Sequence, residues 1–227
     1  MSDGVCVRSR LPQRLGAQVK YALRRIYFQQ MPPYNAEISA GSLMPRESKR
    51  VAALLLTVPD VAAWWHAIEV ENVLQKKTPA TARRQATLIR KRLLTLDAEA
   101  WAMLVEREKE VATQLLLAAA IKHSQLLGDF VRSVYADRQR RLETHLAPIV
   151  WQDFLVECAH RDPAVANWSE STRAKLFQVV VRILVEAKYL DSARSMKLTP
   201  RSLHPDVRRY LSARHDTQVL DCLERAQ

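Results

Sequence analysis

The residues best suited to chemistry in this chain are cations, and they gather between Lys76 and Arg92. This segment contains no Asp or Glu, so its positive side chains lack partners nearby in the sequence. Guanidinium and ammonium groups bind phosphate oxygens, and Arg can do so through two parallel hydrogen bonds. The segment therefore predicts a polyanion-binding face. The candidate contacts are Lys76, Lys77, Thr81, Arg83, Arg84, Thr87, Arg90 and Lys91.

A helix over about 79–95 would hold these cations away from the core. Apolar residues from Ala82 to Leu93 recur on one stripe of a helical wheel, while most of the cations fall on a separate arc. Thr78 followed by Pro79 is typical of an N-cap and a first helical position. The alternative interpretation is a solvated face, or one that pairs with acids elsewhere in the chain, such as those between 106 and 110.

A second group of cations lies in the C-terminal part of the chain. A helix over Ser171–Ala187, followed by alternating short segments within 191–203, is typical of a winged helix. The second half of that helix is strongly apolar, so we expect only its first turns to reach a nucleic-acid groove. The alternative is a packing unit with a basic surface. The predicted contacts are Thr172, Arg173 and Lys175 on the helix, and Arg194, Lys197 and Arg201 in the wing.

The sequence contains no grouping of residues that supports catalysis or a metal site. The 6 histidines are scattered, and none lies at the i, i+4 spacing of zinc-binding helices. Cys158 and His160 are two residues apart, which places them on different faces of a helix. Together with Cys6 and Cys222, the cysteines suggest neither disulfides nor a metal knuckle. We therefore expect no enzyme activity, catalytic residue, metal, cofactor or small-molecule substrate.

Composition favours a basic helical protein with a nucleic-acid partner. The 227 residues carry a net charge of +11, and a polyanion is the usual partner of such a surplus, with an anionic membrane surface as second choice. The chain contains only 4 glycines, which argues against an all-β fold and against glycine-rich phosphate loops. The longest apolar run, 115–121, is too short to cross a membrane. The N-terminus lacks the apolar part of a secretory signal, so we expect a cytoplasmic protein without membrane contact.

Helical periodicity and its start signals predict an all-α fold. We expect a helical bundle with helix-turn-helix-like units, a buried central helix over Val111–Ile121, and a small C-terminal winged-helix-like β excursion. The predicted organisation has three parts: a basic N-terminal arm at 1–14, an N-terminal helical domain at 15–146 that contains the basic helix, and a C-terminal winged-helix-like domain at 147–227.

Short motifs spread along nearly the whole chain resemble the BrxA family, the small accessory proteins of BREX bacteriophage-exclusion systems. The motifs are diffuse helix signatures, and their specificity rests on occurring together in order. They are Gly41-x-Leu43 with Glu47-Ser48, Trp65-x-x-Ile68 with Asn72, Lys77-Thr78-x-x-Thr81-x-x-Arg84 with Arg92-Leu93, Leu115–Ile121 with Gly128-Asp129-Phe130, Trp168-Ser169-x-Ser171-Thr172, and Leu184-x-Glu186-Ala187-x-Tyr189-Leu190.

The resemblance implies a helical protein, similar to the NusB antitermination fold, that binds double-stranded DNA and assists other BREX proteins. Such systems mark host DNA by methylation and block phage replication, and the family implies no catalysis by this subunit. The chain departs from the pattern at Lys188, where we expect Gly. We expect duplex binding through phosphate contacts with low sequence specificity. The alternatives are an RNA-binding antiterminator-like protein and an assembly adaptor for an acidic protein partner.

Overall fold

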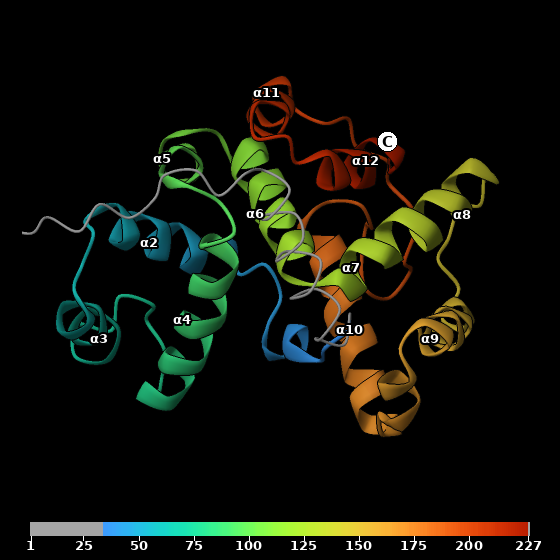
Figure 1. The fold of residues 1–227 in the computed structure, drawn as a ribbon, viewed down its shortest axis with the longest axis horizontal. Coiled ribbons are helices and arrows are strands. Elements are labelled where there is room, and N and C mark those ends of the chain that lie inside the picture. The colour runs from blue at the N-terminus through green and yellow to red at the C-terminus, as the bar shows by residue number, and fades with distance from the viewer. Residues whose placement is uncertain (1–33, 227) are drawn as a thin grey trace, which may run out of the picture. The chain divides into compact units, whose positions relative to one another are not determined.

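The computed structural model describes residues 34–226, and those residues form a set of packed helices (Figure 1). The basic arm at 1–14 and the helix expected over about 15–30 lie outside the described residues. The helices are η1 (Glu37–Ala40), α2 (Pro45–Leu56), α3 (Val61–Glu69), α4 (Pro79–Leu93), α5 (Ala98–Glu106), α6 (Lys109–His123), α7 (Gln125–Asp129), η2 (Phe130–Tyr135), α8 (Ala136–Arg140), α9 (Ile149–Arg161), η3 (Pro163–Asn167), α10 (Glu170–Glu186), α11 (Pro205–Ala213) and α12 (Thr217–Arg225).

Helix starts follow from short polar side chains that cap the first turn. Asp60, Thr78, Asp97 and Ser169 each accept a hydrogen bond from the backbone amide three residues further along. Such a bond satisfies one of the amides that a helix start leaves without an intrahelical partner. The sequence signals therefore predicted where these helices begin.

Helix α6 lies at the centre of the described residues, as its apolar sequence predicted. Leu115, Leu117 and the alanines from Ala118 to Ala120 are fully buried. The helix packs against α2, α4 and α5 and also against α7, α11 and α12 (Figure 1). A helix with neighbours on all sides has no solvent face, which explains why its apolar residues show no stripe.

The predicted C-terminal β excursion is wrong, because residues 34–226 contain no β-strand. The segment after α10 makes only isolated antiparallel bridges, Leu190 with Leu198 and His145 with Lys197. Leu198 donates its amide to Thr144 and not to the opposite side of a hairpin. The segment therefore divides its backbone hydrogen bonds between two different neighbours, and no ladder of paired strands forms.

The helix-turn-helix-like units expected from the sequence each pair a Trp-bearing helix with the basic helix after it, α3 with α4 and α9 with α10, and the two connections differ in the structure. Helices α3 and α4 pack together across residues 70–78, whereas η3 is inserted between α9 and α10. A groove-reading role for either pair stays a prediction. The division into domains at 15–146 and 147–227 also stays a prediction about folding units.

Lys188 occupies the left-handed position that ends α10, with a φ of 67°. Here the amide of Tyr189 bonds back to the carbonyl of Leu184 at 2.8 Å, and the helix stops. Gly is favoured in this conformation because it has no Cβ to meet the following carbonyl. The Gly expected from the family pattern thus has a physical reason, although the turn leads into no wing.

Replacing Lys188 by Gly is expected to raise the free energy of unfolding by about 1 kcal/mol, since the left-handed strain is removed. Urea denaturation followed by circular dichroism measures the change. Lys188→Ala is the control, because it removes the same charge but keeps the Cβ atom. Equal stabilisation by both variants would attribute the effect to charge and would contradict the backbone explanation.

Candidate nucleic-acid interface

Helix α4 buries one face and exposes the other, as the helical wheel predicted. Ala82, Ala86, Ile89 and Leu93 are at most 1% exposed, and they pack into the core. Arg83, Arg84, Thr87 and Lys91 lie on the exposed side. The amphipathic pattern therefore placed the helix correctly, but exposure alone does not leave its cations available to a ligand.

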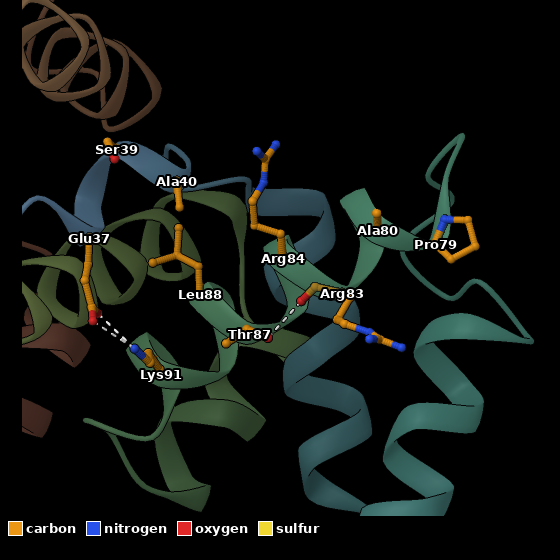
Figure 2. Close-up of a pocket in the computed structure, with 10 residues that line it drawn as sticks. All are labelled: Glu37, Ser39, Ala40, Pro79, Ala80, Arg83, Arg84, Thr87, Leu88 and Lys91. Carbon is orange, nitrogen blue, oxygen red and sulfur yellow. Dashed lines mark hydrogen bonds and ion pairs between the residues drawn. The ribbon is translucent and has the colours of Figure 1, made fainter. Parts of the chain in front are cut away.

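Three of the predicted cations are paired with carboxylates of the same chain. Arg83 donates two hydrogen bonds to Glu69 of α3, at 2.9 and 2.8 Å. Lys91 lies 3.0 Å from Glu37 of η1 (Figure 2). The third, Lys76, is half-buried and pairs with Glu47 of α2. The partners are not the acids at 106–110 that the sequence suggested.

The pair of Arg83 with Glu69 is the most clearly neutralised. The hydrogen bonds from Arg83 lower the pKa of Glu69, and the same bonds raise the pKa of Arg83. The Arg83 guanidinium also lies 5.6 Å from the ring of Trp65. The Arg83 side chain is exposed and Glu69 is half-buried, so a phosphate in water could still compete for the guanidinium. Its positive charge is nevertheless shared before any ligand arrives.

Two arginines of α4 are held by the protein interior. The guanidinium of Arg90 lies 4.6 Å above the ring of Trp64, a cation–π contact, and its buried Nε has no hydrogen-bond partner among the described residues. Arg92, which was not predicted as a contact, is only 4% exposed and donates to the carbonyls of Ser42 and Gly41. These two side chains serve packing more than ligand binding.

Lys77 and Arg84 remain as the exposed cations of this region without an ion pair among residues 34–226. The Arg84 side chain extends away from the helix, in a different direction from Arg83 (Figure 2). The two predicted hydroxyl contacts are engaged locally: Thr81 lies 2.9 Å from the N-cap hydroxyl of Thr78, and Thr87 donates to the carbonyl of Arg83. Of the contacts predicted between Lys76 and Lys91, Arg84 and Lys77 alone combine exposure with the absence of an ion pair within residues 34–226.

An open groove of about 740 Å³ lies between η1 and α4 (Figure 2). We call it the η1–α4 groove. Its lining is mostly apolar, with Arg84 and the Glu37–Lys91 pair as its charged groups besides Arg83. The lining residues are Glu37, Ser39, Ala40, Pro79, Ala80, Arg83, Arg84, Thr87, Leu88 and Lys91.

The start of α10 places its three predicted contacts differently. Lys175 is exposed and has no ion pair within the described part of the chain. Arg173 is half-buried, donates to the carbonyl of Ala166, and its own carbonyl accepts from Trp151. Thr172 donates its amide to Ser169 as part of the cap. Only Lys175 among the three presents a charge to solvent.

The segment at 188–201 provides the clearest set of uncompensated cations. Arg194, Lys197 and Arg201 are exposed, and no carboxylate of residues 34–226 lies within ion-pair distance of them. Lys188, which was not predicted as a contact, is also exposed and unpaired. We call residues 188–201 the basic segment.

A local network holds the basic segment in one shape. The carboxylate of Asp191 accepts hydrogen bonds from the Ser195 hydroxyl at 2.5 Å and from the Lys197 amide at 2.9 Å. These bonds lower the pKa of Asp191, with the Ser195 hydroxyl as the largest cause. The carboxylate thus orders the turn and leaves the lysine ammonium group without an anion. A composition-based prediction found these cations, although it assigned them to a wing that does not exist.

The described residues present neither a metal site nor a membrane span. Residues 34–226 contain no group of three or more His, Cys, Asp or Glu side chains that could hold a metal ion. In the same residues, no helix combines the length and the apolar character needed to cross a membrane. Cys158 and Cys222 are free and buried. Burial raises the pKa of each thiol to about 11.

The sequence is similar to one family over most of its length. The BrxA family profile matches residues 32–215. BREX protein BrxA of Paramagnetospirillum magneticum (strain ATCC 700264 / AMB-1) is 42% identical over 193 residues, which cover 85% of this chain and 97% of that protein. BREX protein BrxA of Escherichia coli O9:H4 (strain HS) is 35% identical over 188 residues, which cover 83% and 88%.

A solved structure has the same fold. The crystal structure of an uncharacterized protein from Magnetospirillum magneticum aligns with a TM-score of 0.79 at 40% sequence identity. The alignment covers 85% of this chain and 98% of that chain. This chain is therefore similar to that protein both in fold and in sequence.

Proposed function

The chain belongs to the BrxA family, and we propose that it is a non-enzymatic accessory protein of a BREX phage-defence system that binds duplex DNA. The relatives are named BREX proteins, which supports the accessory role and makes other BREX proteins its expected partners. Duplex binding is the finer part of the proposal and depends on the charge distribution.

The basic segment is the observation that carries the DNA-binding proposal. Its cations are exposed to solvent and unpaired among residues 34–226, and the carboxylate of Asp191 holds the backbone of the turn that contains Lys197. An unpaired cation can release the counterions of a phosphate without first breaking an internal ion pair, so its full charge contributes to affinity. Lys175 and Lys77 are further exposed cations of the same kind. We therefore assign the main contacts to the basic segment and not to α4.

The expected mode of binding is contact with the phosphate backbone. The basic segment contains lysines and arginines but forms no strand that could enter a groove. Phosphate contacts fix position without reading sequence, so specificity should be low. A protein that neutralises about six phosphates gives a plot of log K against log salt with a slope of roughly −5.

Changing Arg194, Lys197 and Arg201 together to Glu is expected to weaken duplex binding by roughly two orders of magnitude. The salt slope should become shallower by about 3, because each lost phosphate contact removes about one counterion. Fluorescence anisotropy with a labelled random-sequence duplex measures both, at several salt concentrations. Circular dichroism should show unchanged helical content.

The matched control changes three other exposed cations that have no ion pair within residues 34–226: Arg46, Lys49 and Arg107. The net charge changes by the same amount, but the sites lie on α2 and at the end of α5. Equal loss of affinity in both triple variants would show that net charge alone attracts DNA, and would remove the basic segment from the interface. Tighter binding of a structured RNA in parallel titrations would favour an RNA-binding function instead.

A further inference from the structure

The η1–α4 groove differs chemically from the surface assigned to duplex DNA. Its floor is formed by Ala40 and the buried Leu88, and Pro79 and Ala80 line the groove at the start of α4 (Figure 2). A groove of about 740 Å³ is large enough for several side chains of a bound segment. An apolar floor gains free energy from burying apolar side chains, which the edge of a phosphate backbone does not offer.

The charges around this groove favour a ligand with a negatively charged group. Arg84 extends from α4 beside the groove and has no ion pair within residues 34–226 (Figure 2). The groove's own acid, Glu37, is already held by Lys91 at 3.0 Å and lies 3.3 Å from His123. The uncompensated charge at the groove is therefore positive, and a carboxylate is the group that complements it.

We propose that the η1–α4 groove binds an acidic segment of a partner protein, with apolar side chains on the floor and a carboxylate at Arg84. Such a segment combines the two features that the groove offers, an apolar surface and one available guanidinium. The groove shares no lining residue with the basic segment, so binding of a protein partner in the groove leaves the cations assigned to DNA unoccupied. It would give a BREX accessory protein a way to bring another protein to a duplex.

Two other occupants fit the groove less well. Duplex DNA presents rows of phosphates, and it would leave the apolar floor unused while meeting only one unpaired cation. The N-terminal residues 1–33 of the same chain contain six cations and a single acid, Asp3. Their net charge is positive, like that of Arg84, and the two would repel each other. A partner segment rich in Asp or Glu has neither disadvantage.

The groove also has one wall that the protein holds firmly. The loop after η1 is fixed because Arg92 donates to its carbonyls and Glu186 accepts from the amides of Leu43 and Met44. A wall that is ordered before binding costs less conformational entropy when a ligand arrives. The η1 side of the groove is therefore followed directly by a loop that the protein interior holds.

The test is a selection from a random peptide library displayed on phage, with the full chain as the target. Peptides that also bind the variant Thr87→Trp are removed, because an indole at this lining position obstructs the groove. We expect the remaining peptides to share Asp or Glu together with Leu, Ile or Phe at regular spacing. Synthetic versions of these peptides should bind the Arg84→Glu variant about tenfold or more weakly than they bind the unchanged chain, because the variant reverses a charge that contacts the peptide.

Two matched variants separate the groove from general effects. Lys77→Glu changes the charge as Arg84→Glu does, at an exposed site that does not line the groove. Leu94→Trp adds an indole at an exposed position beyond the groove. Both should bind the peptides within about twofold of the unchanged chain, because a contact outside the interface contributes little.

Several results would overturn the assignment. These are a selection that yields no groove-dependent peptide, a consensus without acidic residues, and binding of a synthetic peptide of residues 1–33 in the groove. A loss of duplex affinity on Arg84→Glu that matches the loss in the triple variant of the basic segment would assign the groove to DNA. Duplex binding through the basic segment is measured separately, so failure of either proposal leaves the other open to test.

Discussion

Replacing Asp129 by Ala is expected to lower the free energy of unfolding by about 3 kcal/mol. Asp129 is only 3% exposed, and its carboxylate accepts hydrogen bonds from four side chains. The donors are Tyr34 at 2.7 Å, Gln125 at 2.9 Å, Arg132 at 2.6 Å and Arg161 at 3.2 Å. Removing the carboxylate leaves a buried hydroxyl without its acceptor and two arginines without their anion. Urea denaturation followed by circular dichroism measures the loss.

The expected loss of unfolding free energy lies near the low end of the range for removing one partner of a buried ion pair. The side chains of Arg132 and Arg161 are 38% and 51% exposed, so both guanidinium groups can turn towards water when the carboxylate is removed. The Tyr34 hydroxyl has less freedom, and burial together with its bond to Asp129 raises the pKa of Tyr34 well above its ordinary value. The cost therefore comes mainly from the buried hydrogen bonds and less from the arginines.

Asp137 provides a matched control for this prediction. It also pairs with two arginines, Arg140 and Arg141, but those arginines are more than 60% exposed. Asp137→Ala should lower stability by at most about 1 kcal/mol, as is usual for surface ion pairs. If the two Asp variants were equally stable, burial would not be what makes the Asp129 cluster important.

Much of the fold could be predicted because its determinants are local. Pro45 marks the start of α2, Asp97 caps α5, and Ser169 caps α10, so the signals and the helices they start are adjacent. The predicted wing failed because alternation of residue types says nothing about which segment supplies the hydrogen-bond partner. The amide of Leu146 donates to Met196 and the amide of Leu198 donates to Thr144, across a separation in sequence that no local pattern reveals.

The candidate site was predicted less well, for the same reason. Arg83 and Arg84 are neighbours with identical chemistry, yet Arg83 meets Glu69 from α3 and Arg84 meets no carboxylate within residues 34–226. The partner of Lys91, Glu37, lies further away still, on η1. A sequence shows how many cations a helix carries, but the fold decides which of them keep an unshared charge.

Three residues of the motifs that suggested the family have a structural role. Gly41, Arg92 and Glu186 come from three separate motifs and meet around one loop, residues 41–44. A Cβ atom at Gly41 would lie 2.8 Å from the Met44 side chain and 3.3 Å from Leu88, so a larger residue would disturb the packing beneath the η1–α4 groove. These three motif residues therefore help to build the groove, whereas Arg84 of another motif lines it.

Arg92 gives the second large prediction, a loss of about 3–4 kcal/mol in unfolding free energy on Arg92→Met. Its guanidinium is buried and donates to the carbonyls of Ser42 and Gly41. Burial lowers the pKa of Arg92 to about 10, and the charge of Glu186 partly opposes that shift. The group therefore stays charged at neutral pH. Met fills a similar volume, so the loss reports hydrogen bonds and charge more than a cavity, and urea denaturation measures it.

Arg50→Met is the control for this prediction, because Arg50 also donates to a carbonyl, that of Val73, but is only half-buried. It should cost at most about 1 kcal/mol. A comparable loss in both variants would contradict the importance of burial at Arg92.

A double-mutant cycle shows whether Arg92 and Glu186 act on the same loop. Glu186 accepts from the Ser42 hydroxyl at 2.7 Å and from the Leu43 amide at 2.8 Å, while Arg92 holds the carbonyl side of the same residues. Loss of the hydrogen bonds from either side chain loosens the loop. The double variant Arg92→Met with Glu186→Gln should therefore lose less unfolding free energy than the sum of the two single variants. Strict additivity would mean that each residue stabilises a different part of the structure. Because that loop joins the η1 wall of the groove to α2, the same variants should weaken groove-dependent peptides without changing any residue that lines the groove.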